Sequence, residues 1–144
     1  MSDRATPRRS LGVMRRSADL LHEARQQERA GRIPEAIARF GSAIAAAEQA
    51  GEHTVLAEAL RRLAILRHHG NESGQAHALC RRSYEIARQI GNELLAAEAL
   101  NTLGGLHLAA GKVEDARLTF LEALELGQLA AYVDQVRSGV QSAE

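Results

Sequence analysis

The sequence has little of what builds strands, disulfides or aromatic pockets. Its 144 residues include one cysteine, two prolines, no tryptophan and only 3% aromatic residues. Because Cys80 is alone, an intramolecular disulfide is excluded. No apolar run approaches the roughly 20 residues that a membrane-spanning helix requires. We therefore expect a cytoplasmic protein that has no membrane partner.

An excess of charge of one sign is also missing, since 18 basic residues balance 18 acidic residues. The basic field on which non-specific nucleic-acid binding depends is absent, so we expect no direct nucleic-acid partner. Residues 1–12 contain several arginines and are predicted to form a flexible basic arm. The apolar stretch 11–14 is too short for the core of a signal peptide, so we expect no export.

What the sequence does contain is an abundance of strong helix formers, with Ala, Leu, Glu, Gln and Arg throughout. At 45% apolar residues, the chain is also able to bury a core of useful size. This composition predicts an all-α fold.

A repeat with an offset of 40 residues runs through the chain. Residues of similar size recur at this offset in five sets: Leu20, Leu60 and Leu100; Ala36, Ala76 and Ala116; Phe40, Cys80 and Phe120; Ala43, Ser83 and Ala123; and Ile44, Tyr84 and Leu124. A fixed period of this size is typical of stacked helical units that share a continuous core.

Glycines divide each unit into two helices, because a left-handed residue that ends a helix costs glycine little. Such residues fall within the units at Gly31, Gly70, Asn71 and Gly111, and after the second helices at Gly51, Gly91 and Gly127. The first helices are predicted over about 14–30, 54–69 and 93–110, and the second over about 34–50, 73–90 and 114–127.

Residues 13–128 thus form three helical hairpins, over about 14–53, 54–92 and 93–128. Residues 129–144 are predicted to form a separate C-terminal capping helix. Its apolar stripe consists of Leu129, Tyr132, Val133, Val136 and Val140.

The third unit resembles the tetratricopeptide repeat (TPR) signature through Leu100, Leu103, Gly104, His107, Gly111, Ala116, Phe120 and Ala123. The first unit matches at Leu20, Ala24, Gly31, Ala36, Phe40 and Ala43, and the second at Leu60, Leu63, Ala64 and Ala76, with Cys80 in place of the aromatic residue. The usual period is about 34 residues. The longer period is similar to that of kinesin-light-chain-like and bacterial regulatory repeat proteins.

The resemblance implies a right-handed α-α superhelix, a TPR solenoid of three hairpins plus the capping helix, which binds a protein or peptide in its concave groove. In this family the first helices line that groove. Their residues at spacings of three and four give the expected partner-binding set: Leu21, Arg25, Glu28, Glu58, Arg61, Arg62, Ile65, His68, Glu98, Asn101, Thr102, Gly105 and Leu108.

The family's basic clamp for the C-terminal carboxylate of chaperones is not expected, because Glu98 stands where that clamp needs a base. No two of the six histidines have the i, i+4 spacing of a metal site on one helix. Cys80 is predicted to be a buried thiol, and phosphate-binding loops and nucleophile elbows are absent. We expect no catalytic residue, no metal and no cofactor.

Two alternatives to peptide binding in the groove stay open. The first is a structural self-association unit, a homodimer formed through residues 129–143. The second is a peptide-sensing regulatory module that acts through a separate effector protein, because the chain shows no helix-turn-helix segment with which to read DNA.

Overall fold

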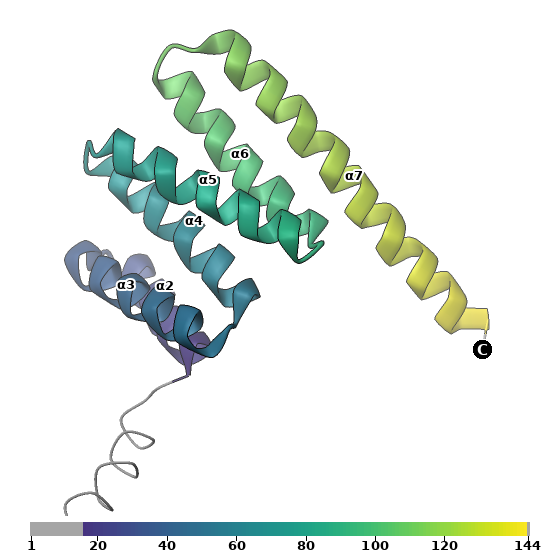
Figure 1. Ribbon diagram of the computed structural model, residues 1–144, viewed down its shortest axis with the longest axis horizontal. Helices are drawn as coiled ribbons and strands as arrows, with labels where there is room; N and C mark the ends of the chain where they lie inside the picture. Colours follow the sequence, from purple (N-terminus) through teal and green to yellow (C-terminus); the bar gives the residue numbers. More distant parts are fainter. Residues whose placement is uncertain (1–15, 144) are drawn as a thin grey trace, which may run out of the picture.

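The computed structural model of the protein describes residues 16–143, and the side chains of residues 16–139. The predicted arm, residues 1–12, lies outside the described residues. Between residues 16 and 143 the chain forms six α-helices and no strand, which confirms the all-α prediction (Figure 1). The helices are α2 (Ser17–Arg29), α3 (Ile33–Ala50), α4 (His53–His69), α5 (Ser73–Gln89), α6 (Glu93–Ala109) and α7 (Val113–Ala143).

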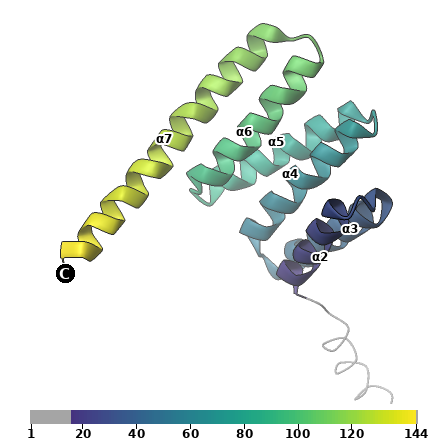
Figure 2. The same ribbon diagram turned by 180° about the vertical axis from the view of Figure 1, so that it is seen from behind.

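Consecutive helices pair into three hairpins, α2 with α3, α4 with α5 and α6 with α7. The hairpins follow one another through space in chain order, as both views of the ribbon show (Figures 1 and 2). The second helix of one hairpin also packs against the first helix of the next, α3 against α4 and α5 against α6. α2, α4 and α6 are therefore the first helices, and α3, α5 and α7 the second helices.

A left-handed residue stands at each of the five turns between these helices. Their φ angles lie between +64° and +78°, at Gly31, Gly51, Asn71, Gly91 and Gly111. The predicted bounds of the first five helices match the observed ones closely, because these turns depend on local backbone preference.

The core lies between the two helices of each hairpin and between successive hairpins. Leucines of the first helices meet alanines of the second, and Phe40 and Cys80 are completely buried. Small residues at these positions let the helix axes approach closely. In the part of the chain that the structure describes, no helix combines the length and apolar character needed to cross a membrane.

The structure corrects one predicted boundary, the break at Gly127. α7 continues through Gly127 to Ala143, so residues 129–143 extend the third hairpin and do not form a separate capping helix. The 40-residue offset explains why, because the counterpart of Gly51 and Gly91 is Ala131. A left-handed conformation costs a residue with a Cβ about 1–2 kcal/mol, so the helix continues through Ala131.

This correction predicts opposite effects for two Gly→Ala substitutions. Gly91 has a φ of +69°, and a Cβ there meets no atom within 4 Å, so Gly91→Ala strains only the backbone. It should lower the free energy of unfolding by about 1–2 kcal/mol. Gly127→Ala lies in an uninterrupted helix with open space around the new methyl group. It should raise the free energy of unfolding by about 0.5–1 kcal/mol.

Urea denaturation followed by circular dichroism measures both values. A loss of stability in Gly127→Ala as large as that in Gly91→Ala would show that the chain turns at Gly127.

Candidate functional site

The predicted groove residues lie on the first helices α2, α4 and α6. α4 neighbours α2 on one side and α6 on the other. We call the surface that these residues form the first-helix face.

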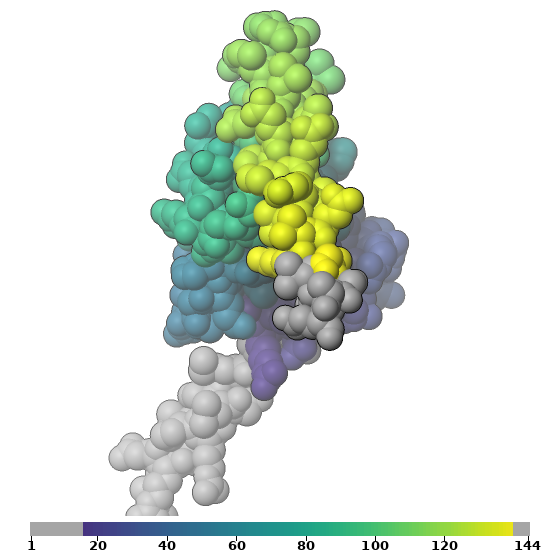
Figure 3. Space-filling model, turned by 90° about the vertical axis from the view of Figure 1, so that its right-hand side faces the viewer, coloured from purple at the N-terminus to yellow at the C-terminus, as the bar shows by residue number. Residues whose placement is uncertain are grey.

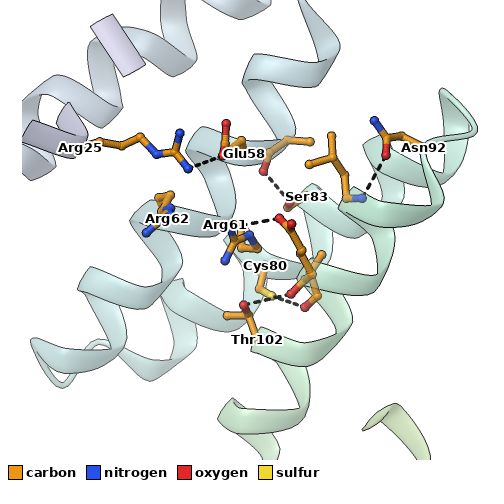
Figure 4. A network of polar contacts seen from close by, with 12 residues as sticks. Arg25, Glu58, Arg61, Arg62, Cys80, Ser83, Asn92 and Thr102 are labelled. Carbon is orange, nitrogen blue, oxygen red and sulfur yellow. Dashed lines mark hydrogen bonds and ion pairs between the residues drawn. The ribbon is translucent and has the colours of Figure 1, made fainter. Parts of the chain in front are cut away.

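Ion pairs between neighbouring first helices occupy much of this face. Arg25 of α2 bonds to Glu58 of α4 at 2.6 Å (Figure 4). Arg61 of α4 pairs with Glu98 of α6 at 3.3 Å. A third pair, between Arg62 and Glu28, is longer than a hydrogen bond at 3.9 Å.

These pairs give the charged groove residues a structural role that the sequence analysis did not assign to them. All six side chains are partly buried, so the carboxylates and guanidinium groups hold one another between adjacent hairpins. Each pair is expected to contribute no more than about 1 kcal/mol, because solvent still screens it. A partner must therefore compete with existing contacts at these positions.

Two predicted groove residues are not available to a partner in the predicted way. Leu21 is buried in the core of the first hairpin, so its assignment to the groove is corrected. Thr102 is half-buried, and its hydroxyl donates a hydrogen bond to the Glu98 carbonyl of its own helix at 3.1 Å.

The remaining predicted groove residues are less exposed on α4 than on α6. Ile65 and His68 on α4 are half-buried, whereas Asn101, Gly105 and Leu108 on α6 are exposed. Leu108 keeps 53% of its surface exposed. The open part of the first-helix face therefore lies toward α6.

Hydrogen bonding on α4 is incomplete. Arg61 Nε, Arg62 Nε and His68 Nδ1 are buried atoms that have no hydrogen-bond partner within the described residues. Buried polar atoms in folded proteins are usually hydrogen-bonded, because an unsatisfied group costs free energy. These three nitrogens leave part of the hydrogen-bonding capacity of α4 unused.

Cys80 is a buried thiol, as the sequence predicts. It lies inside the stack, where its Sγ donates to the Ala99 carbonyl of α6 at 3.1 Å. Burial raises the pKa of the Cys80 thiol to about 12, and the positive charges of Arg61 and Arg81 only partly oppose this. The reactive thiolate is therefore strongly disfavoured at neutral pH.

The structure brings together two histidines from different helices, a pair that spacing within one helix cannot predict. The rings of His77 on α5 and His107 on α6 meet edge to face, with 5.0 Å between their centroids. The pKa of His77 is lowered mainly by burial, and further by electrostatic interaction with His107, Arg81 and Lys112. Among the described side chains, no group of three or more His, Cys, Asp or Glu could hold a metal ion.

A cleft of about 760 Å³ lies where α7 continues past the turns between the hairpins. Its walls are the turn segments 51–55 and 90–94 and, on α7, Ala130, Val133, Asp134 and Arg137. This cleft could not be predicted from the sequence, because it depends on the uninterrupted course of α7.

Comparison with known proteins gives a likeness of fold. No family model matches the chain, and no curated protein matches it. Its structure is similar to the crystal structure of BtubC (BKLC) from P. vanneervenii, with a TM-score of 0.71 and 20% sequence identity. The likeness covers 78% of this chain but 46% of that protein, so the chain spans less than half of its length. At this identity the comparison shows the fold alone.

The ion pair between Arg61 and Glu98 predicts the outcome of a charge exchange. Arg61→Glu places two carboxylates side by side and should lower the free energy of unfolding by about 1 kcal/mol. Adding Glu98→Arg restores an ion pair and should recover more than half of that loss. Urea denaturation measures the four proteins of this double-mutant cycle.

In about 1 M NaCl, where the Debye length falls to about 3 Å, the coupling should shrink. A double variant whose loss of stability at low salt equals the sum of the two single losses would show that the two side chains are not coupled.

Proposed function

We propose that the protein is a non-catalytic protein-interaction module, a right-handed TPR solenoid of three hairpins that binds a protein or peptide segment along its first-helix face. The internal repeat, the stacked hairpins and the likeness of fold to BtubC support the solenoid. We place this activity in the cytoplasm, where a single buried thiol such as Cys80 is ordinary.

The observation that carries the proposal is the chemistry of α4 and α6 side by side. α4 contributes Arg62 and His68, two half-buried side chains that each have one buried nitrogen without a hydrogen-bond partner among the described residues. The 40-residue offset places Leu108 of α6 at the level of His68 of α4. A segment that carries carboxylate or carbonyl oxygens along α4 and one apolar side chain at Leu108 would match this face.

The weakest ion pair indicates where a carboxylate of the partner binds. Arg25 is held by a short hydrogen bond to Glu58, but Arg62 meets Glu28 only at 3.9 Å. Less interaction energy is lost when Arg62 exchanges its partner. We therefore assign the acidic contact to Arg62 and the apolar contact to Leu108 and Gly105.

A capture experiment tests this assignment. The intact chain and a Leu108→Glu variant are used to retain proteins from the lysate of the source cell, and the retained proteins are identified by mass spectrometry. The affinity of the identified partner is then measured with purified proteins. Leu108→Glu and Arg62→Ala should each weaken binding by about tenfold, because one buries a charge and the other removes a charge-assisted hydrogen bond.

The matched control is Leu118→Glu on α7, because Leu118 is a similarly exposed leucine outside the first-helix face. Affinity that is unchanged in Leu108→Glu and Arg62→Ala, or lost equally in Leu118→Glu, would refute the groove.

A second candidate function, self-association through residues 129–143, is favoured by the exposed apolar residues of α7. Leu129, Tyr132 and Val136 follow one another at helical spacing and are all exposed. If this surface pairs with its copy, light scattering should show twice the monomer mass, and Val136→Glu should restore the monomer. A monomer at high protein concentration would exclude this function.

A further inference from the structure

The three second helices differ in how far their equivalent apolar residues are covered. Phe40 of α3 and Cys80 of α5 are both 0% exposed, but their counterpart on α7, Phe120, is 37% exposed. The next position of the same stripe repeats the difference. Ile44 and Tyr84 are half-buried, whereas Leu124 is 57% exposed.

The first helix of the following hairpin supplies the cover in the two earlier cases. Phe40 shares a core cluster with Ala59, Leu63 and Leu66 of α4. Cys80 bonds to the carbonyl of Ala99 and shares a cluster with Leu103 and Leu106 of α6. Each covering helix thus presents an alanine, a leucine four residues later and a second leucine three residues after that.

Among the described residues, no helix follows α7 to cover the outer side of the corresponding stripe, and α7 forms the outer edge of the stack (Figure 3). We call this surface the α7 stripe; it consists of Val113, Phe120, Leu124 and Ala131, which a helical period places on one side. One part of the Phe120 ring is fixed, because a Cβ at Gly104 would lie 2.6 Å from its Cε1 atom. The ring therefore packs on the backbone of α6 and leaves another part open to a partner.

The chain's own first helix does not fit this stripe. The positions of α2 that correspond to Ala59, Leu63 and Leu66 are Asp19, Glu23 and Gln26. Stacking a second copy head to tail would press two carboxylates against Phe120 and Leu124, and burying a charge against apolar groups is costly. The polar α2 is suited to solvent, whereas the α7 stripe is suited to an apolar partner.

We propose that the α7 stripe binds an amphipathic helix of another protein. That helix presents the pattern Ala-x3-Leu-x2-Leu, which α4 presents to α3 and α6 presents to α5. The contacts are those of the two interfaces already inside the molecule: the alanine lies over Phe120, and the leucines lie along Leu124. This surface lies on α7 and is separate from the contacts assigned to Arg62 and Leu108.

A peptide with the sequence of residues 53–69, the helix that covers Phe40, serves as the probe. Labelled with a fluorophore, it is titrated with the full chain, and binding is followed by fluorescence anisotropy. We expect saturable binding that Leu124→Glu weakens by about tenfold, because a carboxylate then faces the leucines of the peptide. A peptide that carries Leu63→Glu should lose affinity to the same extent.

Leu118→Glu is the control in the protein, because Leu118 is 54% exposed on the same helix and lies outside the stripe. It should change the affinity by less than about twofold, as distant surface substitutions do. Circular dichroism and urea denaturation verify that both variants remain folded.

Two results would overturn the proposal. One is no saturable binding, or equal weakening by Leu118→Glu and Leu124→Glu. The other is a concentration-dependent dimer in sedimentation equilibrium that Leu124→Glu abolishes, since a second copy would then cover the stripe. Neither result bears on the groove, whose test uses the captured partner and substitutions in other helices.

Discussion

Covering each second helix on two sides is the constraint on which the rest of this structure depends. A hairpin buries the side of its second helix that meets its own first helix, but leaves the neighbouring side in water. Phe40 and Cys80 become completely buried only because α4 and α6 arrive from the following hairpins. Since apolar burial is the main favourable contribution to folding, the hairpins are expected to stabilise one another.

The polar contacts of the first helices follow from the same stacking. When successive hairpins align, residues 33 to 37 positions apart along the chain come within ion-pair distance, as Arg25 does with Glu58 and Arg61 with Glu98. Opposite charges at these positions favour the observed alignment over a shifted one, where like charges would meet. The charges thus contribute to specificity, and the apolar clusters contribute most of the stability.

The helices and turns could be predicted from the sequence because their signals are local. Gly31, Gly51 and Gly91 each follow a helix in a left-handed conformation, and alanines at 40-residue spacing mark the core. The contacts between hairpins could not be predicted in this way. Periodicity places Leu21 on the groove side of α2, but it does not give the width of the stripe that the core buries. The pairing of His77 with His107 likewise depends on how α5 and α6 meet.

The end of the stack differs from its interior through a change at one position of the repeat. Where the first two hairpins have Gly51 and Gly91, the third has Ala131, and α7 continues to Ala143. A turn there would return the chain along α7 as another first helix and cover Phe120 and Leu124. Because the helix continues instead, the apolar stripe stays open, and the overhanging residues Ala130 and Val133 create the cleft beside the turns. One backbone preference therefore accounts for both the open α7 stripe and the cleft.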